Sequence, residues 1–119
     1  MILQDLAPHV FELGKKRSSP YMTFVVPVRP EYQERIQSAC HVDGTSRLQT
    51  ITEQDNPLLA EPLRLFTELT GVPCLINTSF NVAGEPIVCS PVDALSCFLK
   101  TEMDHLILGN FLVSRDLDD

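Results

Sequence analysis

The 119-residue sequence predicts a small domain of the α/β class, with the α+β class as the alternative. Three observations support this prediction. The hydrophobic fraction of 44% is ordinary for a globular protein. Apolar runs of strand length recur along the chain, and two segments between them carry the pattern of capped helices. No repeat or low-complexity segment divides the chain, so residues 1–119 are expected to form a single domain.

The first half of the chain gives weaker signals than the second. Residues 1–21 are expected to be irregular, because glycine and proline interrupt any periodicity. Residues 22–28 (MTFVVPV) favour a strand, which Pro27 places at a sheet edge or at a bulge. Residues 31–38 favour a short helix or turn. Residues 48–51 alternate like a half-buried strand.

The clearest helix signal covers residues 57–70. Asn56 is a good N-cap, a proline occupies the first helical position, and Gly71 fits the position after the C-cap. Apolar residues at helical spacing predict one core-facing side of this helix: Leu59, Leu63, Phe66, and Leu69 or Thr70.

A second helix is expected to start at Ser90-Pro91 and to run to about Thr101, with Asp93 at its third position. Between the two helices, residues 72–76 (VPCLI) have the pattern of a strand buried on both faces. Two final strands joined by a tight turn are expected at residues 105–108 and 111–113.

Composition and charge exclude several function classes. The net charge of −7 argues against nucleic-acid binding, and the one basic cluster, Lys15-Lys16-Arg17, is more typical of a solvated turn. No apolar stretch reaches the ~18 residues of a membrane span, and the N-terminal segment lacks the order of a signal peptide. The four cysteines lack zinc-site spacing and are interpreted as buried or half-buried thiols: Cys40, Cys74, Cys89 and Cys97. The sequence therefore predicts a cytoplasmic protein without a nucleic-acid partner, a membrane segment or a metal.

Residues 41–47 (HVDGTSR) are polar where the pattern predicts core. Thr45, Ser46 and Arg47 place hydroxyl and guanidinium donors in one loop, and such groups hold phosphate or carboxylate. The alternative, equally weighted, is an Asx-turn in which Asp43 only caps the backbone that follows it.

Residues 77–81 (NTSFN) follow the predicted buried strand and carry four hydrogen-bonding side chains. Ligands of open α/β sheets bind beyond the carboxyl ends of the strands, so these residues are candidates for a polar pocket. The alternative is that asparagine and serine at a strand end simply form turns. The occurrence of two such polar segments favours a site.

The strings SPYM, HVDGTSRLQT, GVPCLINTSFNVAGEPIVCSPVDALSCF and LILGNFLV resemble the C-terminal domain of the NodU/CmcH/TobZ family of O-carbamoyltransferases. The resemblance covers about residues 7–115. Members of this family carbamoylate hydroxyl groups in antibiotics and nodulation factors. The resemblance implies a YrdC-like domain, with a mixed twisted sheet flanked by helices, that makes carbamoyl-adenylate from carbamoyl phosphate and ATP.

The resemblance also implies roles for individual residues. Arg47 matches a phosphate-binding arginine, and Asn77 and Ser79 match the Asn-x-Ser pair of the nucleotide site. Thr45 and Asn81 are added as second-line contacts because of their positions in the two motifs. The resemblance identifies no catalytic residue in this chain.

The family's metal-bearing, Kae1-like acceptor domain and the arginine-rich upstream half of the YrdC-like domain have no counterpart in the sequence. The chain is therefore expected to be a partial domain, inactive by itself, whose missing parts are either carried by a separate chain or lost by truncation. The rival hypothesis is a non-catalytic remnant or assembly module that keeps the fold and weak anion binding. A missing half would expose apolar surface, so self-association is also expected.

Overall fold

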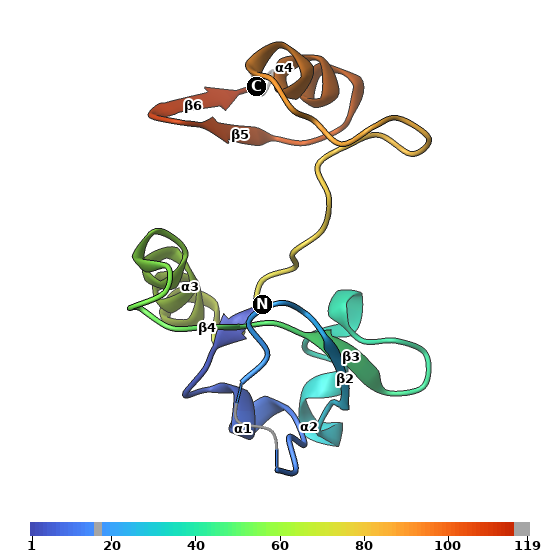
Figure 1. Ribbon diagram of the computed structural model, residues 1–119, viewed down its shortest axis with the longest axis vertical. Coiled ribbons are helices and arrows are strands. Elements are labelled where there is room, and N and C mark those ends of the chain that lie inside the picture. Colours follow the sequence, from blue (N-terminus) through green and yellow to red (C-terminus); the bar gives the residue numbers. More distant parts are fainter. Residues whose placement is uncertain (16–17, 116–119) are drawn as a thin grey trace. The chain divides into compact units, whose positions relative to one another are not determined.

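The computed structural model describes residues 1–15 and 18–115 of the chain (Figure 1). They fall into a first unit, Met1–Asn77, and a second unit, Thr78–Asp119, and each unit is described here by itself. The single domain expected over residues 1–119 stays a prediction. Lys16 and Arg17 of the expected basic turn lie outside the described residues.

The first unit contains two small sheets and several helices (Figure 1). One sheet pairs β1 (Ile2–Leu3) with β4 (Thr50–Ile51) in parallel, and the other pairs β2 (Phe24–Pro27) with β3 (Thr45–Leu48) in antiparallel. Its elements, in chain order, are β1 (Ile2–Leu3), α1 (Ala7–Val10), β2 (Phe24–Pro27), α2 (Pro30–Gln33), a 3₁₀ turn (Gln37–Ala39), β3 (Thr45–Leu48), β4 (Thr50–Ile51) and α3 (Pro57–Thr70). The N-terminal 21 residues are thus not wholly irregular, because they include β1 and α1.

Strand β3 has the alternation of a half-buried strand. Ser46 and Leu48 are buried, while the Arg47 side chain between them is exposed. Ser46 can occupy a core position because its hydroxyl donates a 2.6 Å hydrogen bond to the carbonyl oxygen of Ala39. The expectation of one loop over residues 41–47 is therefore wrong: the turn ends before Thr45, and the strand begins there.

Helix α3 has the predicted ends. Asn56 Oδ1 accepts a 3.2 Å hydrogen bond from the Leu59 N–H, and Gly71 adopts the left-handed conformation, with φ of 70°, that favours glycine. Its buried side overlaps the expected one only in part. Ala60 and Leu63 are buried, and α3 lies against β1.

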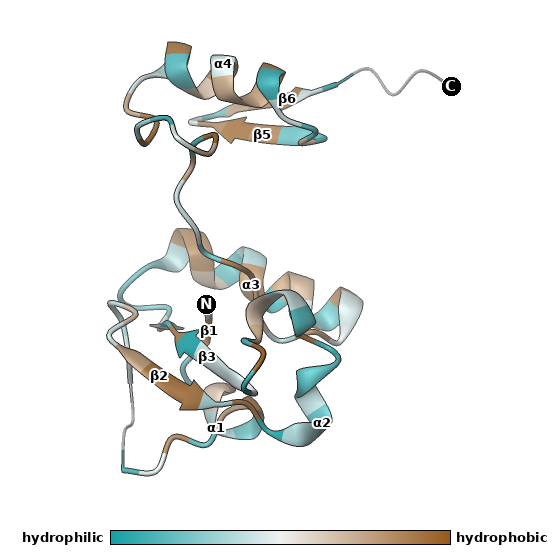
Figure 2. Cartoon of the chain, turned by 90° about the vertical axis from the view of Figure 1, so that its right-hand side faces the viewer, coloured by the Kyte–Doolittle hydropathy of each residue, from teal (hydrophilic) through white to brown (hydrophobic). Residues whose placement is uncertain are grey.

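The expected core face of α3 is therefore only partly correct. Leu59 is 40% exposed and Leu69 is 85% exposed. Apolar residues lie on more than one side of this helix, so helical spacing alone did not identify the packed side (Figure 2).

The buried strand expected at residues 72–76 is wrong. This segment is extended, but it makes only one isolated bridge, between Cys74 and Ile2, and Ile76 is 56% exposed. A strand that is buried on both faces lies in a sheet that other elements cover above and below. Among the described residues, the segment pairs only with the chain around β1, where the Leu75 N–H donates to the Met1 carbonyl at 3.0 Å.

The second unit forms as the sequence predicts. Helix α4 (Pro91–Lys100) begins after Ser90, whose hydroxyl oxygen accepts from the Asp93 N–H at 3.2 Å. Strands β5 (His105–Leu108) and β6 (Phe111–Ser114) pair in antiparallel. The core of this unit is formed by Ala94, Phe98 and Leu106.

The combination of helices with small parallel and antiparallel sheets confirms the predicted mixed class, in the form of a partial α+β fold. The described strands form two-stranded pieces instead of one continuous sheet. In the part of the chain that the structure describes, no helix is long and apolar enough to cross a bilayer. Cys97 is buried, and Cys40 and Cys74 are half-buried, but Cys89 is exposed, which corrects the expectation for that thiol.

Candidate functional site

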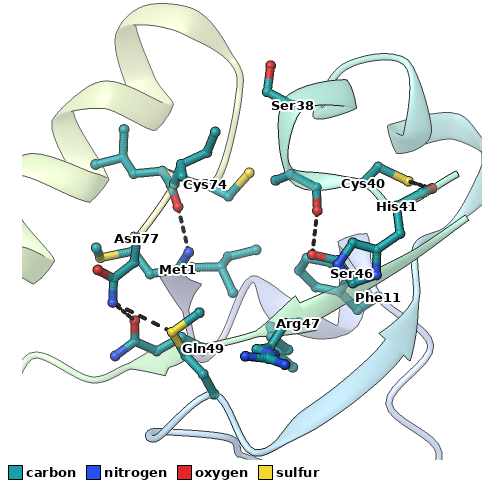
Figure 3. A pocket seen from close by; sticks show the side chains of 16 residues that line it. Met1, Phe11, Ser38, Cys40, His41, Ser46, Arg47, Gln49, Cys74 and Asn77 are labelled. Atoms are coloured by element: carbon teal, nitrogen blue, oxygen red, sulfur yellow. Dashed lines mark hydrogen bonds between the residues drawn. The ribbon is translucent and has the colours of Figure 1, made fainter. Parts of the chain in front are cut away.

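A pocket of about 190 Å³ in the first unit contains two of the predicted site residues, Arg47 and Asn77 (Figure 3). Arg47 comes from β3, and Asn77 comes from the end of the extended segment that follows α3. The other polar side chains lining the pocket include His41, Ser46 and Gln49. None of the described residues that line it is Asp or Glu, although the chain has 16 of these residues.

Arg47 is presented to solvent by the alternation of strand β3. Its register partner across the antiparallel pair is Val25, which offers no charge. Within the described part of the chain, the Arg47 side chain has no hydrogen bond or ion pair. Its guanidinium group therefore keeps its donors for a ligand, and the planar fork suits phosphate or carboxylate.

The turn before β3 is the Asx-turn that the sequence offered as an alternative. Asp43 Oδ1 accepts hydrogen bonds from the Thr45 N–H at 3.0 Å and from the Thr45 hydroxyl at 2.7 Å. These bonds, the hydroxyl's first, hold the pKa of Asp43 below its ordinary value. Thr45 is not among the residues lining the pocket, and its only hydroxyl hydrogen is committed to Asp43.

His41 is tied to the same turn. Its Nδ1 lies 3.0 Å from the Thr45 hydroxyl oxygen. Because that hydroxyl already donates to Asp43, it can only accept from His41, so Nδ1 carries the hydrogen. The other ring nitrogen, Nε2, is then the acceptor in the neutral imidazole, and the residue belongs to the pocket lining.

The amide of Asn77 is held by a neighbouring amide (Figure 3). Asn77 Nδ2 donates a 2.7 Å hydrogen bond to Gln49 Oε1, and the same nitrogen lies 3.7 Å from the Met22 sulfur. Gln49 Nε2 in turn donates to the carbonyl oxygen of Pro20 at 3.1 Å. The chain of three groups links the SPYM string to the NTSFN string.

Ser79 and Asn81 belong to the second unit. Ser79 is exposed. Asn81 Nδ2 donates to the carbonyl oxygens of Val82 and Glu85, both at 3.1 Å, so its amide nitrogen closes a local turn. The convergence of Arg47, Asn77 and Ser79 on one cleft stays a prediction.

No metal centre is visible in the described residues, where no three His, Cys, Asp or Glu side chains group closely enough to hold an ion. Cys40 and Cys74 do line the pocket. Burial raises the pKa of the Cys74 thiol, which disfavours the thiolate form that binds metals.

Residue-by-residue reading of the sequence missed Gln49. Its signal was the alternation that continues from β3 into β4, which separates the buried residues Leu48 and Thr50 by one position. Gln49, which lies between them, is half-buried and polar, as expected at the border of a pocket.

The chain has relatives among known proteins. The family described as "Carbamoyltransferase C-terminus" matches residues 1–115. Nodulation protein NolNO of Sinorhizobium fredii is 44% identical over 115 residues, which cover 96% of this chain and 17% of that protein. Nodulation protein NolO of Bradyrhizobium diazoefficiens is 43% identical over 114 residues, covering 95% of this chain and 21% of that protein. Nodulation protein U of Rhizobium tropici is 43% identical over 114 residues, covering 96% and 19%. The chain thus spans about a fifth of the length of these relatives.

Proposed function

Because the chain belongs to the carbamoyltransferase C-terminal family, we propose that it forms part of an O-carbamoyltransferase and supplies one wall of the site that makes carbamoyl-adenylate from carbamoyl phosphate and ATP. The carbamoyl group is then transferred to a hydroxyl acceptor. Arg47 binds a phosphate group, Asn77 and Ser79 bind the reacting ligand, and Thr45 and Asn81 support the two motifs.

One observation carries this proposal: the pocket holds an arginine without a partner in the described residues and is lined by no described carboxylate. A chain with net charge −7 repels anions at long range, so a local site without acidic residues is what an anion needs. A charge-assisted hydrogen bond contributes about 1.5–3 kcal/mol, which corresponds to about 10- to 100-fold in affinity.

The rest of the reaction is assigned to groups outside these 119 residues. We propose that a Kae1-like acceptor domain and the upstream half of this domain, on a separate chain or elsewhere in the same polypeptide, provide the metal, the acceptor site and further cations. The length of the relatives supports this division, since their matched part is 17–21% of the whole. We place the reaction in the cytoplasm, with antibiotics or nodulation factors as the class of acceptor.

Calorimetric titration with pyrophosphate at low ionic strength tests the phosphate site. The chain is expected to bind weakly, and Arg47→Ala is expected to abolish measurable binding while leaving the unfolding transition nearly unchanged. Arg47→Lys restores part of the affinity, because an ammonium group cannot make the bidentate contact. The matched control is Arg64→Ala, which removes the same charge from an arginine bound to Glu53 and Glu61 outside this pocket.

A second candidate function, a non-catalytic remnant or assembly module, is favoured by the Asx-turn at Asp43. That turn satisfies Thr45 internally and needs no ligand. Equal affinity for pyrophosphate in the Arg47→Ala variant and the unchanged chain would support the remnant and contradict the phosphate site.

A further inference from the structure

The hydrogen bonds around Gln49 determine which way the Asn77 amide faces. The Pro20 carbonyl can only accept a hydrogen bond, so the Gln49 side chain must turn its nitrogen towards it, as the 3.1 Å contact shows. Gln49 Oε1 is then the atom that faces Asn77. Two oxygen acceptors at 2.7 Å would repel each other, so Asn77 must present its nitrogen.

Both N–H groups of Asn77 are used by this arrangement. One donates to Gln49, and the nitrogen also lies near the weak acceptor sulfur of Met22. Among the described residues, the Oδ1 atom of Asn77 has no hydrogen-bond partner. The side chain of Asn77 can therefore accept a hydrogen bond from a ligand through Oδ1, but it has no free N–H group to donate.

This polarity separates the roles of the two predicted site residues. Arg47 has only donors and suits an anion. Asn77, turned by Gln49, suits an N–H or O–H group and disfavours a phosphate oxygen, which is itself an acceptor. A ligand that fits both residues carries a phosphate at one end and a hydrogen-bond donor at the other.

We propose that Gln49 is a positioning residue that turns the Asn77 carbonyl oxygen towards the amino group of the carbamoyl moiety, and that this contact distinguishes a carbamoyl phosphate from other acyl phosphates. The inference rests on the proposed function, because it takes the same pocket as the carbamoyl phosphate site. The pocket volume of about 190 Å³ supports a small ligand, since pockets for drug-sized ligands typically hold roughly 300–1,000 Å³.

Carbamoyl phosphate and acetyl phosphate test the contact, because they have nearly the same shape and differ in an amino group against a methyl group. Their affinities for the 119-residue chain are measured by NMR titration in the cold, with inorganic phosphate as a third probe. The unchanged chain is expected to prefer carbamoyl phosphate about three- to tenfold, the range that one net hydrogen bond gives. Gln49→Leu is expected to remove this preference, so that the two acyl phosphates bind with equal affinity.

Two further variants separate positioning from general damage. Gln49→Glu keeps an acceptor for the Asn77 N–H but replaces the N–H that donates to the Pro20 carbonyl with an acceptor oxygen, so it is expected to reduce the preference, and its charge weakens the binding of both acyl phosphates. Gln54→Leu makes the same change as Gln49→Leu at an exposed position outside the pocket, and it is expected to leave the preference intact. AMP and IMP form a parallel pair, because a preference for AMP that Gln49→Leu abolishes would assign the donor to adenine and overturn the assignment to the carbamoyl group.

The outcomes distinguish this inference from the proposed function. Arg47-dependent binding of phosphate with equal affinities for the two acyl phosphates would overturn the role of Gln49 and leave the proposed function standing. A preference that persists in Gln49→Leu would also overturn it. Failure of all three phosphates to bind would overturn both.

Discussion

Ser19 and Thr50 hold each other through a reciprocal pair of hydrogen bonds. The Ser19 N–H donates to Thr50 Oγ1 at 2.8 Å, and the Thr50 N–H donates to the Ser19 carbonyl oxygen at 3.0 Å. Both residues are buried, and the Ser19 hydroxyl adds a 2.8 Å bond to the Leu48 carbonyl. This connection places the Pro20 carbonyl beside Gln49 and thereby supports the pocket.

Thr50→Val is expected to destabilise the first unit by about 1–3 kcal/mol, because the nearly isosteric change leaves the Ser19 N–H buried without its acceptor. Thr50→Ser keeps the hydroxyl and is expected to cost less. Urea unfolding of the two variants measures the difference. Equal free energies of unfolding would contradict the role of the hydroxyl.

The Asp43 carboxylate is expected to titrate below its ordinary value of 3.8, chiefly because it accepts from the Thr45 hydroxyl. A carboxyl group whose pKa is lowered by folding stabilises the fold above its unfolded pKa, and this contribution is lost as the pH falls through the folded pKa. Thr45→Val should raise the pKa of Asp43 towards 3.8. Carboxyl ¹³C shifts followed by NMR from neutral to acid pH check the direction, and an unchanged pKa in the variant would refute the cause.

Ser90→Ala is expected to weaken helix α4 by about 1 kcal/mol, because the Asp93 N–H loses its capping oxygen. The Asp93 carboxylate also accepts from the Ser90 hydroxyl at 2.7 Å, and this bond is the main cause of its lowered pKa. The same variant should therefore raise the pKa of Asp93. Amide hydrogen exchange in α4 and an NMR titration measure the two effects, and Ser96→Ala on the same helix is the control.

The purified chain is expected to transfer no carbamoyl group to a hydroxyl acceptor. The described residues contain no group of His, Cys, Asp and Glu that could hold a metal, and the relatives devote about four fifths of their length to other parts. Mass spectrometry of a sugar acceptor incubated with carbamoyl phosphate and ATP measures transfer. Metal-independent transfer by these 119 residues would refute the proposal that the acceptor site and the metal lie outside this chain.

Leu69→Glu is expected to reduce self-association of the chain. Leu69 lies near the end of α3, with 85% of its surface exposed, and exposed apolar side chains favour association in water. Light scattering at several protein concentrations measures the effect. Thr70→Glu, which adds the same charge at the neighbouring exposed position, is the control, and equal effects of the two changes would attribute the result to charge alone.

The sequence predicted helix ends best, because the free backbone groups at a helix end are hydrogen-bonded or accommodated by residues close by in sequence. Asn56 and Gly71 defined α3, and Ser90 defined the start of α4, because a cap acts within one turn of helix. The buried side of α3 could not be predicted in the same way. Leu63 and Leu69 are both leucines, yet Leu63 is buried and Leu69 is exposed, because burial depends on which parts of the chain pack against the helix.

The site was predictable only where a local sequence motif identifies its residues. Arg47 and Asn77 were identified by their motifs, and the structure places both on one pocket. The sequence identified Asn77 only as a hydrogen-bonding side chain. It could not show that the amide donors of Asn77 are already used, because Gln49, which accepts from it, lies far away in sequence. An amide's orientation depends on such a partner, and no local pattern reveals it.

The orientation of the Asn77 amide depends on a main-chain atom, because the carbonyl oxygen of Pro20 orients Gln49, and Gln49 orients Asn77. Every amino acid has a backbone carbonyl oxygen. Substitutions at position 20 can therefore leave the orientation of the Asn77 amide unchanged, provided that the backbone path is kept. Positions 49 and 77 have no such freedom, since each must supply a side-chain amide or a close substitute. A comparison of many homologues should therefore find variation at position 20 beside restriction at positions 49 and 77.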